Sequence, residues 1–356
     1  MRLTRKFLFA ALSITISFHA QATGFRDFEG WHVGCDNTGA CRAMGFPLDH
    51  GLPRGTLTIL DRQAGPEGKF RWLRVGPMET DATVFVDGKK IADLLASAFE
   101  EGDDKTPQAL VDQKLIAAII AAGLDGKHLA FDADAKENER ISLQGFKAAM
   151  LYIDEQQGRV GTQSAIVAKG EKPASAVPAA KPVPLLRLKE IPKKGKPDPS
   201  LAKAILEFHK RFAKKDECSN IAEGEPSVIS SAPLDRKGWV FEVDCWRAAY
   251  QAGTILYMFT YEKNHAAAQF APVEMLNTKT GRVSTTRGRS LSNLGFETAA
   301  QIDAFHKGRG VGDCGTSESW RWDGAVYRLA DYRIMVACGV DADEDNWITL
   351  WRTREK

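Results

Sequence analysis

The sequence lacks the short motifs that mark common enzymes and metal sites. It contains no H-E-x-x-H, no G-x-S-x-G and no S-x-x-K with its companion motifs, and no C-x-x-C pair. These absences remove the usual signatures of zinc peptidases, serine hydrolases, thiol redox centres and structural zinc. We therefore predict no catalytic residue, no metal ligand and no cofactor. A triad assembled from distant residues is recognised only by its geometry, so whether the protein is an enzyme stays open.

Long apolar runs are also scarce, and the single one stands at the start of the chain. Three basic residues precede the apolar run 7–18, and Ala20-Gln21-Ala22 places small residues at the two positions that a signal peptidase reads. The run is shorter than the roughly 20 residues that a membrane span needs. We predict a cleavable signal peptide over residues 1–22, a secreted periplasmic protein, and no transmembrane anchor after cleavage.

The six cysteines support this compartment, because an even number of cysteines behind a signal peptide is typical of disulfides. Two lie near the N-terminus and four lie beyond residue 197. Six cysteines permit fifteen pairings, so the sequence does not fix the connectivity. The simplest expectation is sequential pairing: Cys35–Cys41, Cys218–Cys245 and Cys314–Cys338.

Charge is nearly balanced over the whole chain, with a formal net charge of +2, but one segment departs from this balance. Residues 168–197 hold eight basic residues, two acidic ones and six prolines. This composition favours an extended spacer, so we predict a Pro/Lys-rich linker between domains at 23–167 and 198–356 that fold independently. Solvation explains the charge of the linker most simply, and weak attraction to an anionic wall or lipid surface is the sharper alternative. The second domain is not net basic, which disfavours nucleic acid as a partner.

Hydrophobic periodicity and turn residues predict an α+β fold, with mostly antiparallel sheets and segregated helices in both domains. In the first domain we expect strands at 55–62, 70–72, 85–86 and 129–131, and helices at 107–122 and 145–156, the latter capped by Ser142. In the second domain we expect helices at 200–214 and 296–307. The strands expected there lie at 239–244, 254–261, 319–322, 327–329, 334–338 and 347–352.

Two features are candidates for a recognition surface. The loop between Cys35 and Cys41 contains Asp36 and Asn37, and a rigid, exposed recognition loop is one interpretation of it. We favour a simple stapled turn, because these residues suit a turn without any ligand. The tryptophans of the second domain, among them Trp320, Trp322 and Trp351, would form an aromatic platform if exposed. Core packing is the more common role of such residues, and we favour it.

The acidic run 341–345 resembles the first half of a calcium loop. Its alternate carboxylates are Asp341, Asp343 and Asp345. Asn346 replaces the usual glycine, and Arg352 stands where a bidentate glutamate is needed. We predict an acidic turn without strong calcium binding, neutralised by Arg352 or Arg354.

Five phrases carry a resemblance to a known family. They are WHVGCDNTGACRA (31–43), AMLYIDEQQGRVGT (149–162), GDCG (312–315), WRWDG (320–324) and WITLWR (347–352). In this order and spacing they resemble the domain-of-unknown-function 1176 family of proteobacterial envelope proteins. That resemblance implies a class and a compartment, and no reaction or ligand. The first domain alone, through Trp31, the two nearby cysteines and residues 141–149, is similar to invasion-associated locus B proteins.

These observations together favour a non-catalytic envelope protein that binds another protein or a cell-wall component such as a glycan. The alternative is a hydrolase of envelope polymers with a dispersed active site. Nothing in the sequence predicts the oligomeric state.

Overall fold

The computed structural model describes residues 24–47, 57–75, 82–94, 109–189, 191, 197–214, 217–218, 226–234, 238–262, 265–339 and 343–356. The predicted signal peptide lies outside these ranges. Within them, no helix combines the length and the apolar character that a bilayer span requires. The chain has the expected α+β fold, rich in antiparallel sheet and joined by three disulfides.

The N-terminal part of the chain forms two antiparallel sheets and two helices. The larger sheet, in spatial order, consists of β1 (Phe25–Phe28), β2 (Trp31–Cys35), β3 (Cys41–Gly45), β4 (Leu57–Arg62), β5 (Phe70–Val75) and β8 (Ala109–Leu110). The smaller sheet consists of β10 (Ile141–Ser142), β9 (His128–Ala130), β6 (Ala82–Val86) and β7 (Lys89–Leu94).

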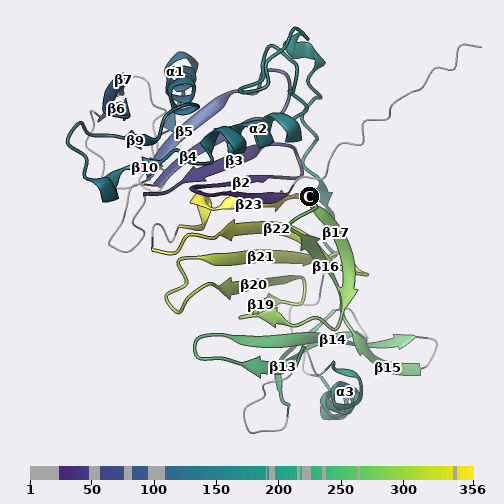
Figure 1. Ribbon diagram of the computed structural model, residues 1–356. Coiled ribbons are helices and arrows are strands. Elements are labelled where there is room, and N and C mark those ends of the chain that lie inside the picture. Colours follow the sequence, from purple (N-terminus) through teal and green to yellow (C-terminus); the bar gives the residue numbers. More distant parts are fainter. Residues whose placement is uncertain are drawn as a thin grey trace, which may run out of the picture.

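Helices α1 (Gln113–Gly123) and α2 (Phe146–Gln156) cover one side of the larger sheet (Figure 1). Helix α1 begins later than predicted because the Asp112 side chain accepts hydrogen bonds from two backbone N–H groups of the first turn. Helix α2 has the predicted extent but not the predicted cap. Its N-cap is Gly145, at φ +83°, where a side chain would collide with the Phe28 carbonyl oxygen.

The C-terminal part contains helix α3 (Pro199–Phe212) and two larger sheets. In one sheet the order is β12 (Val228–Pro233), β13 (Trp239–Arg247), β14 (Ala252–Glu262) and β15 (His265–Phe270), with β18 (Leu291–Ser292) also on β14. In the other the order is β17 (Arg282–Arg287), β16 (Pro272–Asn277), β22 (Tyr327–Met335), β21 (Gly315–Trp322), β20 (Gln301–Lys307) and β19 (Gly295–Thr298), with β23 (Ile348–Arg352) also on β22. The short 3₁₀ helices are η2 (Glu137–Glu139), η3 (Ala174–Ala176) and η4 (Glu344–Asn346).

The helix predicted over 296–307 is wrong, because this segment forms the antiparallel pair β19 and β20. Ile302 and Ala304 are buried, whereas Asp303 between them and Phe305 after them are only half-buried, which is the period of a strand. Pairing of β20 along seven residues of β21 outweighs the local helical pattern. The strands predicted separately at 327–329 and 334–338 are one strand, β22.

One hydrophobic core joins the two parts of the chain. It combines residues of β3 and β4, such as Met44 and Ile59, with Trp320 and Ile348 from the C-terminal sheet. In Figure 1, β23 lies directly beside β2. The contact is close at Gly34, where a Cβ would overlap the side chains of Ile348 and Leu350. The domain limits and independent folding stay predictions, and this shared core weighs against independent folding.

The segment predicted as a linker is in contact with both parts. Lys181 donates its backbone N–H to Thr38, and Lys189 donates to Trp322. Between them, β11 (Leu185–Leu186) pairs in parallel with the C-terminal strand β24 (Arg354–Glu355). Residues 168–189 therefore form a strap that follows the surface of the molecule rather than a free spacer.

We predict that Gly34→Val destabilises the junction by about 1–3 kcal/mol, since overpacking a closely packed contact costs this much. Thermal unfolding and proteolytic cleavage of the strap would measure the effect. Gly295→Ala in β19 is the control, because a Cβ there meets only one atom, at 3.6 Å. Equal melting temperatures for both variants would contradict the assignment of Gly34 to the junction.

Candidate functional site

The disulfide between Cys35 and Cys41 closes a compact ring at the end of β2 and β3, and confirms the first predicted pair. Inside the ring, Asp36 Oδ1 accepts hydrogen bonds from Thr38 N at 2.8 Å, from Thr38 Oγ1 at 2.6 Å and from Ala40 N at 3.2 Å. Gly39 adopts φ +90°, which completes the turn. Both cysteines and Asp36 are buried, so the ring is a rigid element.

The ring binds a residue of its own chain, Arg352 at the end of β23. Arg352 Nε lies 2.6 Å from Asp36 Oδ2, and its Nη2 donates to Thr38 Oγ1 at 3.0 Å. The Asn37 side chain donates to the Arg352 carbonyl at 2.9 Å and accepts from the Arg352 N–H at 3.0 Å. The ring therefore does recognise an extended strand, but that strand lies in the same molecule.

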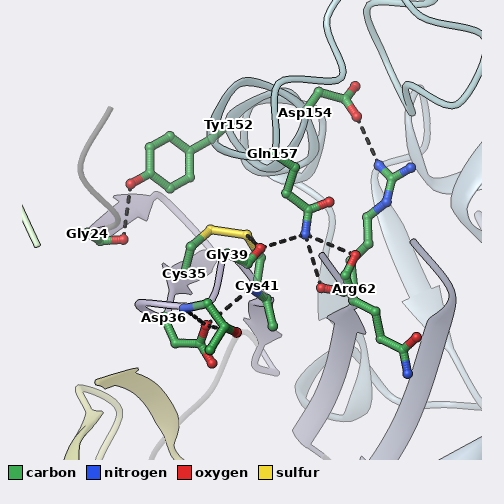
Figure 2. Close-up of a disulfide and its surroundings, with 12 residues drawn as sticks. Gly24, Cys35, Asp36, Gly39, Cys41, Arg62, Tyr152, Asp154 and Gln157 are labelled. Atoms are coloured by element: carbon green, nitrogen blue, oxygen red, sulfur yellow. Dashed lines mark hydrogen bonds and ion pairs between the residues drawn. A yellow bond between two sulfur atoms is a disulfide. The ribbon is translucent and has the colours of Figure 1, made fainter. Parts of the chain in front are cut away.

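A buried polar network lies behind the ring (Figure 2). Gln157 at the end of α2 donates to the carbonyls of Gly39 and Arg62. Asp154, which is fully buried, accepts from Arg62 Nη1 at 2.9 Å and from backbone N–H groups at 166–168. Burial and the neighbouring charge of Arg159 lower the pKa of Arg62 to about 9. This network fixes the chain that leads from α2 into the strap.

The tryptophan platform is not present. Trp320 and Trp322 are buried in the shared core, as the packing alternative predicted. Trp320 donates its indole N–H to the Glu274 carbonyl at 2.6 Å, so even its polar atom is used inside the molecule. Trp351 is half-buried and donates to the Leu329 carbonyl. As a recognition surface, the predicted set Asp36, Asn37, Trp320, Trp322 and Trp351 is mostly internal, because its members join the two parts of the chain.

The acidic turn has a different counter-charge from the one predicted. Arg333 Nη1 lies 2.6 Å from Asp345 Oδ1, and Arg333 also pairs with Asp331. Arg352 instead pairs with Asp36. Asp343 accepts a hydrogen bond from the Asp345 N–H and starts η4, while Asp341 lies outside the described residues. The prediction that this turn binds no calcium strongly stays untested.

The second and third predicted disulfides, Cys218–Cys245 and Cys314–Cys338, are also confirmed, so the described chain has no free cysteine. The carboxylate of Asp313 lies close to the sulfurs of Cys314 and Cys338. Because the two sulfurs are bonded to each other, they are not available as a pair of thiolate ligands. The carboxylate is used by Arg309, and this ion pair lowers the pKa of Asp313.

Asp313, Cys314 and Cys338 stabilise an exposed loop that the sequence did not single out. This loop, formed by residues 308–314, is called the tip. Arg309 makes two bonds to Asp313, and Asp313 accepts from Gly339 N at 2.8 Å. The neighbouring turn of β13 and β14 is joined to the tip by two hydrogen bonds between Gln251 and Lys307. At the centre of the loop, Val311 is 78% exposed. In the sequence, the alternating glycines Gly308, Gly310 and Gly312 around Val311 were the pattern that could have indicated this loop.

Tyr250 extends the same surface, since its ring lies against Gly310 and it is 45% exposed. Among the large hydrophobic residues within the described ranges, Val311 has the most exposed side chain. The tip thus presents an exposed apolar side chain on a loop that is held by a disulfide, an ion pair and a backbone hydrogen bond.

A polar hollow lies on the outer face of the β20–β21–β22 sheet. Its volume is about 370 Å³, and its lining includes Asp303, Asp331, Glu344, Ser317 and Ser319. Burial raises the pKa of Asp331. Glu318 also borders the hollow, but strand alternation places its side chain on the opposite face, with Thr316.

Comparison with known proteins gives the same family as the five sequence phrases. A family model described as "Protein of unknown function (DUF1176)" matches residues 25–354. The chain belongs to this family. It is 30% identical over 365 residues to the uncharacterized protein YpfG of Escherichia coli (strain K12), an alignment that covers 98% of each chain. No solved structure matches the chain.

The family assignment brings no reaction, so a catalytic site in this member of the DUF1176 family can be recognised only from the geometry of its own residues. His306 Nδ1 lies 3.1 Å from Ser292 Oγ, but within the described ranges no carboxylate pairs with this histidine. His32 pairs with Asp27 at 2.5 Å, and His209 shares a buried hydrogen bond with Tyr257 at 2.7 Å. His50 lies outside the described residues. None of these three histidines joins a hydroxyl group to a carboxylate through these contacts.

We predict that Arg352→Ala lowers the free energy of unfolding by about 1–3 kcal/mol, because it leaves the buried Asp36 carboxylate without its charged partner. A double-mutant cycle with Asp36→Ala, measured by denaturant unfolding, should give a coupling energy of about 0.5–3 kcal/mol. Arg354→Ala, two residues further along, is the matched control. A coupling energy near zero would mean that the ring and β23 are held together without this ion pair.

We also predict a pH-dependent effect at Glu318, whose pKa burial raises to about 7. When the pKa of a carboxyl is higher in the folded state than in the unfolded state, the folded protein loses stability as the pH rises from the unfolded-state pKa through the folded-state pKa. Glu318→Gln should therefore raise the melting temperature at pH 8 and leave it unchanged near pH 4. Glu155→Gln, at an exposed glutamate, serves as control, and a stabilisation that is independent of pH would refute the assignment.

Proposed function

We propose that this protein is a non-catalytic binding protein of the periplasm, secreted by its cleavable signal peptide, and that its partner is another envelope protein. Three disulfides are the chemistry of an oxidising, extracytoplasmic compartment and support this location. The observation that carries the binding proposal is the tip, where Val311 is exposed on a loop held by a disulfide and an ion pair, next to the exposed Tyr250 of the turn between β13 and β14.

Such a tip suits protein recognition for an energetic reason. Association costs free energy for every loop that must be ordered, and a loop already fixed by Cys314–Cys338 and Arg309–Asp313 avoids much of this cost. Aromatic and aliphatic side chains at the centre of a contact supply most of the binding energy. Lys307 beside the apolar centre favours a partner surface with an acidic rim, whereas the charge of Arg309 is balanced by Asp313.

The test is site-specific crosslinking. A photoreactive residue at position 311 should trap a defined envelope protein in intact cells, and Val311→Asp should abolish capture of that protein by purified bait. Position 160 is the matched control, since Val160 is also exposed, at 46%, but lies far from the tip in the sequence. Identical crosslinks from positions 311 and 160, or capture that survives Val311→Asp, would overturn the proposal.

The polar hollow supports a second candidate function, hydrolysis of an envelope polymer. Carboxyl groups in unequal environments can divide the roles of acid and base, and in this hollow burial raises the pKa of Asp331 even though Arg333 is paired with it. In this case turnover of a glycan or peptide substrate should be lost in Asp331→Asn and retained in Val311→Asp. The reverse pattern, partner capture lost only in Val311→Asp, supports the binding protein.

A further inference from the structure

The ribbon formed by β11 and β24 has two chemically different faces. Leu185 pairs with Arg354 and Leu186 pairs with Glu355, and paired residues have their side chains on the same face. The ladder continues to the C-terminus, since Lys356 N donates to the Leu186 carbonyl at 3.1 Å. By alternation, Arg187 lies on the face of Leu185, and Lys356 lies on the face of Arg354.

The face of Leu186 and Glu355 is turned toward the molecule. Glu355 Oε1 lies 2.6 Å from Arg321 Nε in β21, and Leu186 is half-buried. The other face is therefore the outer one. It presents Leu185, which is 48% exposed, together with three exposed cations, Arg187, Arg354 and Lys356.

None of these three cations forms an ion pair with any residue in the described ranges, whereas many other arginines of the C-terminal sheets are paired with carboxylates. The adjoining strap adds Lys181 and Lys189, both exposed and likewise without an ion pair to described residues. Leu185, which is paired with Arg354, adds an exposed apolar side chain to this basic face.

We propose that this face of the ribbon binds an anionic phospholipid surface. Cations that surround an exposed aliphatic side chain match the interface of a bilayer, where headgroup phosphates lie over apolar chains. Attachment to the rigid sheet through Arg321 and Glu355 holds the cations in place before binding. The proposal does not depend on the tip, and it would place the protein at a membrane surface through its strap.

Co-sedimentation of the purified protein with vesicles tests this. The protein should bind vesicles of phosphatidylcholine mixed with phosphatidylglycerol, bind pure phosphatidylcholine hardly at all, and lose binding as salt is raised. The triple variant Arg187→Gln, Arg354→Gln and Lys356→Gln should bind roughly 100-fold more weakly, about fivefold for each cation removed. Leu185→Ser should weaken binding several-fold with no change of charge.

The control is a triple variant with the same change of net charge, Lys89→Gln, Lys114→Gln and Lys127→Gln, at exposed positions in the N-terminal part. It should bind like the unchanged protein. Equal loss in both triple variants would show only a net-charge effect and overturn the proposal. Binding to purified peptidoglycan sacculi with none to anionic vesicles would overturn it as well.

Discussion

The contact between the Cys35–Cys41 ring and Arg352 determines how the two halves of this protein are joined. Asp36, Asn37 and Thr38 together satisfy the guanidinium, the N–H and the carbonyl of one residue, so the ring fixes both the position and the direction of β23. With β23 in this orientation, Ile348 and Leu350 lie over Gly34, where only a glycine leaves room for them. The shared core of Met44, Ile59 and Trp320 can form only if this approach is correct.

The strap depends on a second internal constraint, the buried charges behind the ring. Two arginines, Arg62 and Arg159, are buried with one carboxylate, Asp154, and such an excess of charge is unfavourable unless its hydrogen bonds are satisfied. The partners come from the segment after α2: Ser164 accepts from both arginines, and N–H groups at 166–168 donate to Asp154. The network can therefore be satisfied only when the chain leaves α2 along the path that leads into the strap.

Local features of the sequence predicted local features of the structure well. The disulfides followed from the grouping of the cysteines, and α2 and α3 followed from apolar periodicity. The family followed from five short phrases whose order and spacing are matched over nearly the whole chain. The helix predicted over 296–307 was wrong because pairing with strand β21 decides the conformation of this segment. Local periodicity does not encode that pairing.

The candidate site was less predictable for the same reason. Asp36 and Asn37 were correctly identified as turn-forming residues, but their partner Arg352 is more than 300 positions away, and no local pattern connects them. Likewise, the proline and lysine content of residues 168–197 predicted a spacer. Composition cannot show that the strap binds the backbone carbonyls of Thr38 and Trp322.

Side chains whose polar atoms are bonded inside the molecule have structural roles in this fold, whereas exposed apolar side chains on a fixed backbone mark candidate binding surfaces. Asp36, Trp320 and Arg352 were candidates for recognition or counter-charge, and each has its polar atoms bound inside the molecule. Val311 and Leu185 are the opposite case: each is an exposed apolar side chain on backbone that is fixed by a disulfide, an ion pair or a paired strand. Fixing exposed apolar surface in this way lowers the entropy lost on binding, and it adds little to the packing of the chain itself. These two surfaces, one beside Tyr250 and one among Arg187, Arg354 and Lys356, are therefore available for binding, because the internal contacts of the fold do not require either.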